Sequence, residues 1–261
     1  MENLSIMNDT EKKQIIDENI KIIKNIQHLC EIKPVKIYYN KNFKFKETNQ
    51  FCDVEILPIN SITLCKQYEQ YRPVILNTID HKFNGLEIDN YKNCTNEMIY
   101  LRTSFSYQCL RKDMYPLKLS EVVYSSKVIV MRDENLELTS DVIEISIITA
   151  NPIQNLIMKK NIMNLGDYFL TKDTIENIFH TAYLNGHQVL ILNDFGCKKF
   201  NIPVQDLIDI YNMVVLTYGS LFKLIIFSIE IMNQEERKYY NMFENGIIKP
   251  QNLVLNNKFK F

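Results

Sequence analysis

The sequence is poor in the residues that build the most readily recognised sites. Its 261 residues include no tryptophan, six glycines and four scattered histidines. The six cysteines have no paired close spacing, which indicates neither a zinc site nor a disulfide framework. We therefore predict reduced thiols, as in a cytoplasmic protein, and neither a metal nor a cofactor.

The chain also lacks an excess of charge of one sign and a long apolar run. Its 30 Lys and Arg residues nearly balance its 31 Asp and Glu residues, so nothing indicates electrostatic attraction to a nucleic-acid backbone. The longest apolar run, Leu221–Met232, contains Lys223 and Glu230 and is too short to span a bilayer. The first residues are not those of a signal peptide. We expect neither a nucleic-acid partner nor a membrane, and interpret the run as a buried strand.

The chain contains enough apolar residues to form a sizeable hydrophobic core. Hydrophobic residues make up 46% of the chain and charged residues 23%, and 14 Phe with 15 Tyr supply bulk. The length fits one large α/β domain with extensions. We predict an N-terminal helix and connecting segment at 1–50, a main domain at 51–230 and a C-terminal tail at 231–261.

The two ends of the chain have patterns of their own. After Asp9, apolar residues recur at helical spacing as far as Cys30, which predicts an amphipathic helix packed on the main domain. The segment 36–50 has no clear period and suits an edge strand or an ordered loop. In the tail, 239–243 suits a short helix, and 253–261 suits extended pairing with the domain or a partner.

Apolar strands alternate with helices through the main domain. Predicted strands are 54–57, 74–77, 122–124, 128–131, 142–148, 189–192 and 224–229, and predicted helices are 61–71, 94–111, 174–184 and 204–217. Ser61, Pro203 and Asn185–Gly186 act as helix start and stop signals. The first strand, helix and strand imply parallel pairing. Continuously apolar strands with helices between them predict a three-layer α/β/α domain around a mixed central sheet.

The most informative stretch is Leu190–Pro203, in which a strand leads into a turn and a proline-started helix. Such turns hold phosphates in α/β proteins, because backbone N–H groups converge there. Gly196 allows a positive φ and a close approach of the ligand. Lys198 and Lys199 can bring positive charge to this turn, whereas Asp194 brings negative charge.

A second group of motifs is spread in order from the strand end at residue 76 to residue 152. Its members are Leu76–Asn77, Gly85–Glu87, Asn96–Met98 after eight further residues, Arg102–Ser104, Val123–Ser126, Val128–Asp133 and Asn151–Pro152. Several of these would be weak alone, but their order makes the set specific.

Together with Gly196 and Cys197, these motifs resemble the microbial-type poly(ADP-ribose) glycohydrolases, a branch of the macro domain fold. That family has a Leu-Asn strand end, three glycines, Gln-Glu-Glu, Arg-x-Ser and, in a second loop, Gly-Cys-Gly. The resemblance implies a macro-like fold, hydrolysis of ADP-ribose linkages, and a pocket for ADP-ribose or a related nucleotide, free or on an ADP-ribosylated protein. It covers neither the first 45 residues nor the tail.

The phosphate loops depart from the family pattern. Leu86 would crowd the ligand where the family has glycine. If Glu87 faced the phosphates, like charges about 4 Å apart would cost roughly 4 kcal/mol at an effective dielectric constant of about 20. Asp194 raises the same objection at the second loop. His81 and Lys82 either replace lost phosphate contacts or are solvated loop residues.

The catalytic triplet departs as well. The resemblance places the family's catalytic glutamate, which protonates the departing ribose oxygen, at Met98. A thioether cannot donate that proton, and loss of a general acid costs on the order of 10²- to 10⁴-fold in rate. Glu97 matches the first glutamate, and is either a displaced acid or a solvated residue at a helix start. We predict that glycohydrolase activity is lost.

The other candidate residues each have two interpretations. Asn77 either bonds a ribose hydroxyl or satisfies turn backbone groups. Cys197 is either a nucleophile or a small buried hydrophobe, and Phe195 and Phe227 either stack on the ligand or belong to the core. The candidate ligand-binding set is Asn77, Gly85, Asn96, Asn193, Phe195, Gly196, Cys197, Lys198 and Phe227.

Three functions stay open at this point. The first is a catalytically inactive macro-type domain that binds an ADP-ribose-like nucleotide. The second is a protein-interaction scaffold that uses the N-terminal helix and the tail. The third is a hydrolase that uses Glu97. Polar groups facing one cleft would favour the first, and a cleft filled by Leu86 and Met98 would favour the second.

Overall fold

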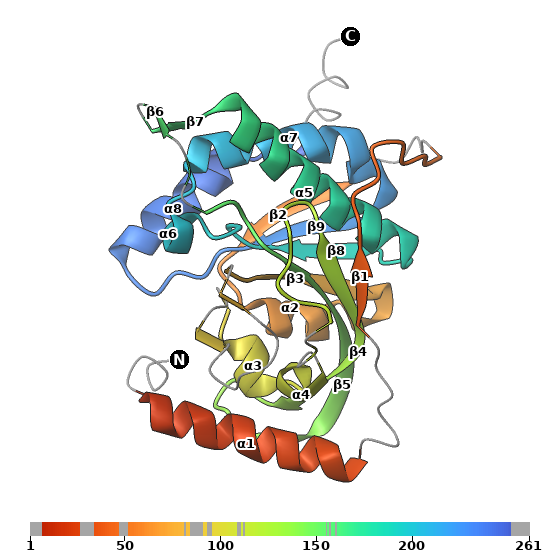
Figure 1. The fold of residues 1–261 in the computed structure, drawn as a ribbon, viewed down its shortest axis with the longest axis vertical. Helices are drawn as coiled ribbons and strands as arrows, with labels where there is room; N and C mark the ends of the chain where they lie inside the picture. Colours follow the sequence, from red (N-terminus) through yellow and green to blue (C-terminus); the bar gives the residue numbers. More distant parts are fainter. Residues whose placement is uncertain are drawn as a thin grey trace.

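The centre of the fold is a sheet of seven strands (Figure 1). The computed structural model describes residues 7–26, 34–46, 52–80, 82–83, 91–92, 96–108, 111, 113–154, 156, 158–159 and 161–251. The sheet strands are β1 (Val35–Ile37), β2 (Asp53–Leu57), β3 (Pro73–Thr78), β4 (Val122–Arg132), β5 (Leu138–Ala150), β8 (Val189–Leu192) and β9 (Leu224–Ser228). A separate two-stranded sheet consists of β6 (Met158–Lys159) and β7 (Ile162–Met163).

The order across the sheet is β1, β4, β5, β3, β8, β9, β2. Strands β5, β3, β8, β9 and β2 run parallel, whereas β4 and β1 pair antiparallel with their neighbours. The predicted mixed sheet is therefore confirmed. The predicted direct pairing of the first strand, helix and strand is wrong, because β8 and β9 lie between β2 and β3. The sequence pattern indicates strand direction but not which strands are neighbours.

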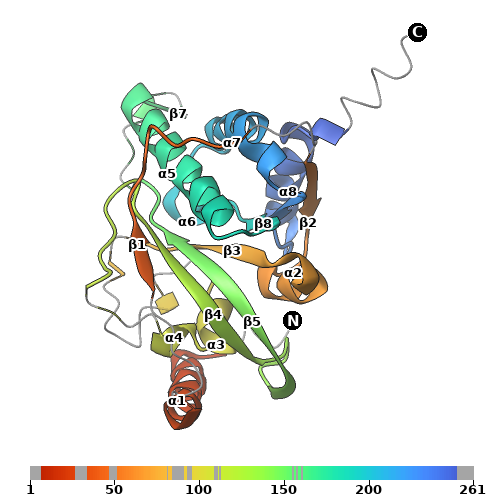
Figure 2. The ribbon, with the colours of Figure 1, turned by 90° about the vertical axis from the view of Figure 1, so that its right-hand side faces the viewer.

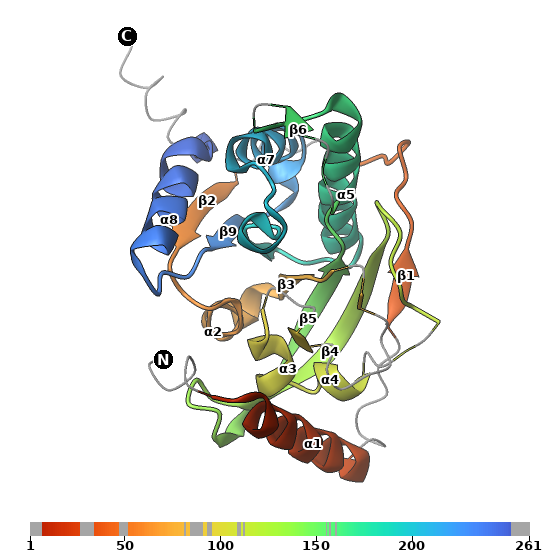
Figure 3. The same cartoon turned by 60° about the vertical axis from the view of Figure 1, so that its left-hand side comes forward.

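Helices cover both faces of the sheet, which confirms the three-layer prediction (Figures 2 and 3). One face carries α5, α7 and α8, and the other carries α2, α3 and α4, with α1 outside them. The helices are α1 (Asp9–Ile26), α2 (Ser61–Gln67), α3 (Met98–Arg102), α4 (Phe105–Gln108), α5 (Leu165–Leu184), α6 (Cys197–Phe200), α7 (Val204–Tyr218) and α8 (Gln234–Gly246).

Two apolar cores lie on the two sides of the sheet. Leu76, Leu190 and Ile225 belong to the core under α5 and α7, and their neighbours Ile75 and Ile191 belong to the core under α2 and α3. Successive residues of a strand point to opposite faces. Strands buried on both faces therefore read as continuous apolar runs, which is why the sequence located them well.

The predicted helix 94–111 is two short helices among its described residues, with an extended break at Thr103. Thr103 forms an isolated bridge to Val130, and the Ser104 N–H donates to the Ile129 carbonyl at 2.8 Å. The Ile129 N–H donates in turn to Ser104 Oγ at 2.8 Å. Pairing with β4 thus replaces helical hydrogen bonds at Thr103 and Ser104. No local sequence signal predicts this break in the helix.

Other boundaries differ in smaller ways. Asn60, rather than Ser61, caps α2, because its side chain accepts from the Ile62 N–H at 3.0 Å. The two predicted runs 122–124 and 128–131 form the single strand β4, with a register shift between Ser125 and Val128. Helix α5 begins nine residues earlier than predicted and ends at Leu184 as expected.

The two ends of the described chain are helical. Helix α1 packs on the main domain as predicted, and the segment after it provides the edge strand β1. The predicted tail helix is α8, which packs on α7 and β2. The predicted extended pairing at 253–261 lies outside the described residues. Within the described part of the chain, none of the helices has the length and hydropathy required to cross a bilayer.

Candidate functional site

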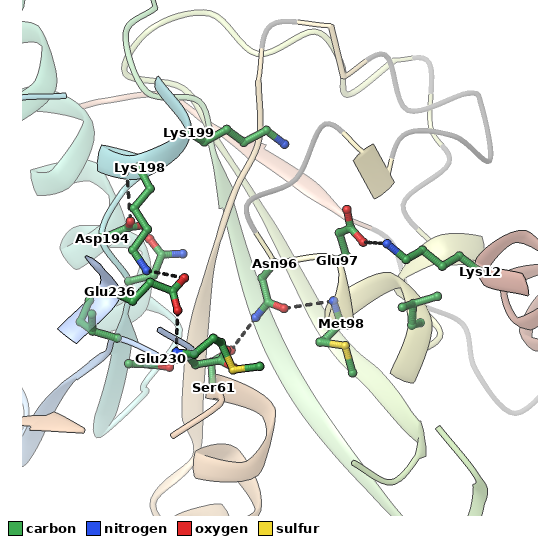
Figure 4. A pocket seen from close by; sticks show the side chains of 15 residues that line it. Lys12, Ser61, Asn96, Glu97, Met98, Asp194, Lys198, Lys199, Glu230 and Glu236 are labelled. Atoms are coloured by element: carbon green, nitrogen blue, oxygen red, sulfur yellow. Dashed lines mark hydrogen bonds and ion pairs between the residues drawn. The ribbon is translucent and has the colours of Figure 1, made fainter. Parts of the chain in front are cut away.

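A cavity of about 380 Å³ opens at the carboxyl ends of β8 and β9 (Figure 4). Ligand sites in open α/β sheets occur at this edge. Its walls come from α1, the start of α2, the 96–101 segment, the loop after β8, and the chain between β9 and α8. The polar residues that line it are Lys12, Ser61, Asn96, Glu97, Asn193, Asp194, Lys198, Lys199, Ser228, Glu230 and Glu236.

Asn193 fixes the loop that follows β8. Its Oδ1 accepts from the Phe195 N–H at 2.9 Å and from the Thr78 hydroxyl at 3.0 Å. Its Nδ2 donates to the Leu76 carbonyl at 3.2 Å. The side chain therefore joins the ends of β3 and β8, and its polar atoms are engaged within the protein.

The Asp194 carboxylate accepts hydrogen bonds from backbone N–H groups of the same loop. Its Oδ1 accepts from the Gly196 N–H at 3.2 Å and its Oδ2 from the Lys198 N–H at 3.5 Å. Burial raises the pKa of Asp194, and the Lys198 charge and the backbone N–H groups oppose that rise. A carboxylate of the chain itself thus lies where a loop of this kind would otherwise receive a ligand anion.

Gly196 is required by the shape of this loop. Its φ is +79°, and a Cβ placed on it would lie 2.3 Å from Cδ2 of Phe200. We expect Gly196→Ala to lower the free energy of unfolding by roughly 2 kcal/mol, measured by urea denaturation, from left-handed strain plus the clash. In a Phe200→Ala background, Gly196→Ala should lower the free energy of unfolding by less, because the clash with Phe200 is absent and only the backbone strain remains. An equal cost in both backgrounds would contradict the clash.

The two lysines of the loop both reach the cavity. Lys198 Nζ lies 3.1 Å from Glu236 Oε1, and Lys199 Nζ donates to the Lys92 carbonyl at 2.6 Å. Glu236 also accepts from the Met232 N–H at 2.6 Å, so the start of α8 is tied to the cavity. The cationic side chains predicted from the sequence are therefore present at this wall.

The 96–98 segment forms the opposite wall. Asn96 Nδ2 donates to Ser61 Oγ at 3.1 Å, and Asn96 Oδ1 accepts from the Met98 N–H at 3.1 Å. Glu97 Oε2 lies 2.7 Å from Lys12 Nζ. The Met98 side chain lines the cavity and packs against the core beneath it.

Glu230 is a cavity carboxyl that the sequence analysis missed as a site residue. The Asn60 side-chain amide donates to Glu230 Oε1 at 2.9 Å, and Arg102 Nη1 donates to Asn60 Oδ1 at 3.4 Å. Burial raises the pKa of Glu230, and the nearby Glu236 charge adds to the rise. Lys12, Ser61 and Glu236 were missed too. No motif marks any of these residues, because they meet only after distant segments fold together.

Structural comparison decides the fold. The chain aligns with a poly(ADP-ribose) glycohydrolase from Thermomonospora curvata at a TM-score of 0.75, over 91% of this chain and 100% of that chain. It has the fold of a bacterial poly(ADP-ribose) glycohydrolase. The resemblance stated from the motifs is therefore confirmed at the level of the fold.

The likeness to these glycohydrolases extends to a second organism. A Deinococcus radiodurans poly(ADP-ribose) glycohydrolase mutant in complex with ADP-ribose aligns at a TM-score of 0.60, over 75% of this chain and 84% of that chain. The Thermomonospora curvata enzyme bound to the inhibitor ADP-HPD aligns at 0.71. Sequence identities are 12% for the Thermomonospora enzyme and 14% for the Deinococcus enzyme. No protein-family model and no curated protein matches the sequence.

Four of the residues predicted to bind ligand are buried and are not among the residues that line the cavity. Phe195 and Phe227 are fully buried in the core under α7, and Asn77 is fully buried too, with Nδ2 3.5 Å from Thr149 Oγ1. Cys197 is buried, and burial raises the pKa of its thiol well above the ordinary value, which favours the inert interpretation over the nucleophile. This burial agrees with the second interpretation that the sequence offered for Phe195, Phe227 and Cys197, and a ligand contact by any of the four stays a prediction.

Of the remaining predicted residues, four line the cavity, Gly196 is buried after β8 and is not part of the lining, and Gly85 is outside the described residues. Asn96, Asn193 and Lys198 line the cavity, as does Glu97. Gly85 lies outside the described residues, together with His81, Leu86 and Glu87. Across the residues that the structure describes, no cluster of three or more His, Cys, Asp or Glu side chains is arranged to hold a metal ion.

Proposed function

We propose that this protein binds an ADP-ribose-like nucleotide, free or attached to a protein, in the cavity at the ends of β8 and β9 and does not hydrolyse it. The observation that carries the proposal is the cavity itself. It lies at the ligand-binding edge of the sheet, and Lys12, Lys198 and Lys199 reach it from two walls. Solved glycohydrolases of this fold hold ADP-ribose or ADP-HPD, which supports the choice of ligand class.

The wall opposite the lysine loop supports the loss of hydrolysis. Met98 faces the cavity at the position that the resemblance assigns to the catalytic acid, and a thioether has no proton to give. Glu97 is engaged by Lys12, so its carboxyl would have to leave that ion pair before it could reach a ligand oxygen. The hydrolase interpretation therefore has less support than binding.

One observation favours a second candidate, a protein-interaction scaffold in which the cavity takes no nucleotide. Asp194 already accepts from two loop N–H groups, and it shares the cavity with Glu97, Glu230 and Glu236. The described lining thus holds four acidic side chains against three lysines, and each acid that is ionised repels a diphosphate. Binding of ADP-ribose decides between the two functions.

The test combines titration with turnover. We expect ADP-ribose to bind the natural protein with micromolar affinity in calorimetry, and poly(ADP-ribose) to stay intact in its presence. Met98→Glu should then release ADP-ribose at least about 10²-fold faster, because it supplies the missing acid. Met98→Gln, which is polar but cannot act as the acid, is the matched control and should remain inactive.

Two results would contradict the proposal. Turnover by the natural protein would return the hydrolase interpretation, and Glu97→Gln should then abolish it. Absence of heat with millimolar ADP-ribose in all three proteins would favour the scaffold.

A further inference from the structure

Helix α1 is fastened along the segment that forms one wall of the cavity. Its Asp9 accepts from the Tyr91 hydroxyl at 3.1 Å and pairs with Lys92. One turn later, Lys12 pairs with Glu97. Two turns beyond that, Asn19 Nδ2 donates to the Leu101 carbonyl at 2.9 Å. The contacts recur at helical spacing, so one face of α1 follows the wall.

Buried groups make this attachment a fixed part of the fold. Asn19 and Ile16 have no exposed surface, and Ile23 is 1% exposed. Asn19 Oδ1 also accepts from Arg132 Nε at 2.8 Å, which ties α1 to the end of β4. Helix α1 therefore holds the wall in place even when a surface charge on the helix is changed.

Lys12 is the residue of α1 that lines the cavity. It lines the cavity together with Glu97, and the distance between Lys12 Nζ and Glu97 Oε2 is 2.7 Å. The Lys12 side chain is 18% exposed and that of Glu97 is 38% exposed. Figure 4 shows the lysine reaching toward this carboxylate from α1, across the cavity from Lys198 and Glu236.

The charged residues that line the cavity explain why Lys12 matters for binding an anion. Among the described residues, four acidic side chains and three lysines line it, and Lys198 is already paired with Glu236. Within this described lining Lys12 is the lysine paired with Glu97, so its removal breaks that ion pair and takes one positive charge away from the lining. A ligand that carries phosphates would be repelled by the unpaired Glu97 carboxylate, most strongly at low ionic strength.

We infer that helix α1 is part of the ligand site and that Lys12 determines whether the cavity accepts an anionic ligand, by neutralising Glu97. This inference rests on the proposed function, since it concerns the same cavity. It assigns the N-terminal helix a role in binding, beyond its packing on the domain. Lys12 acts here as a specificity-determining residue.

The test is a charge cycle in the full-length protein. ADP-ribose is titrated into the natural protein, Lys12→Gln, Glu97→Gln and the double variant. We expect Lys12→Gln to weaken binding about 10-fold or more, and the double variant to regain most of that loss. Lys21→Gln removes the same charge from an exposed position of α1 and should leave binding unchanged. Urea denaturation of all five proteins checks that each is folded.

The outcomes separate this inference from the proposed function. If the natural protein binds ADP-ribose and Lys12→Gln binds it equally well, or the double variant shows no recovery, the inference is overturned and the proposed function stands. If the natural protein does not bind ADP-ribose, the proposed function fails, and inorganic pyrophosphate serves as the anionic probe in the same cycle by NMR. Pyrophosphate binding that depends on Lys12 would then support the inference, and its absence would overturn it as well.

Discussion

The free energy of unfolding is expected to fall by about 3 kcal/mol between pH 7 and pH 4 because of His180 on α5. This side chain is 3% exposed, and among the described residues neither ring nitrogen has a hydrogen-bond partner. Its ring stacks on Phe43 with centroids 3.8 Å apart and meets the Tyr218 ring edge-on at 4.8 Å. An imidazolium in this aromatic enclosure would lose its hydration without gaining a partner.

The direction follows from the two states of the histidine. Burial lowers the pKa of His180 from 6.5 to about 4, although the Glu176 charge opposes the change. Between these values the unfolded chain binds a proton at this residue and the folded chain does not. The stabilisation is therefore complete above the ordinary pKa, and is lost as the pH falls toward the folded-state value.

His180→Phe isolates this effect from the other titrating groups. Phenylalanine retains the aromatic contacts and has no basic nitrogen, and the change removes no hydrogen bond to the part of the chain that the structure describes. Chemical denaturation of both proteins at several pH values should give curves that diverge as pH falls, with the variant the more stable one in acid. Parallel curves would show that His180 is protonated in the folded protein at little cost.

Asn19→Ala is expected to lower the free energy of unfolding by roughly 2 to 4 kcal/mol. The change removes the partner of the Leu101 carbonyl and one partner of Arg132, which is itself 5% exposed. A buried donor or acceptor without a partner bears its full desolvation cost. Alanine favours the helix more than asparagine does, so helix propensity opposes the loss.

Gln14→Ala on the exposed side of α1 is the matched control for Asn19→Ala. It truncates a polar side chain to alanine on the same helix without breaking a buried contact, gains less helix propensity than Asn19→Ala does, and should leave stability nearly unchanged. Urea denaturation of the two variants gives the comparison. A cost for Asn19→Ala no larger than that of the control would mean that water replaces the lost partners, and that α1 is attached less firmly than its contacts indicate.

The two results bear on each other through the N-terminal part of the chain. Asn19 anchors α1 beside the cavity, whereas His180 holds the segment after β1, through Phe43, against α5. The N-terminal segment therefore contacts both helical layers. Through Lys12 it also contributes to one wall of the candidate site.

Much of the fold follows from local sequence. Strands such as Val189–Leu192 and Leu224–Ser228 are apolar throughout, and the bounds of α7 follow from Pro203 and the apolar spacing after it. The ordered motifs also led to the glycohydrolase fold, because strand ends and turns demand particular residues at fixed places. These signals are local, so they can be read without knowing which segments are neighbours.

The candidate site depended on the tertiary structure. The sequence marked the loop at Asp194–Lys198, but not that the Asp194 carboxylate accepts from the loop's own N–H groups. It left open whether Phe227 stacks on a ligand or faces the core, since a strand buried on both faces has no polar side to mark its orientation. Lys12 and Glu97 are far apart in the chain and meet only because α1 packs on the wall. The sequence determined the helices, the strands and the type of fold. Long-range packing decided which charged side chains pair in the cavity and which side chains point toward the core, and no local pattern encodes that packing.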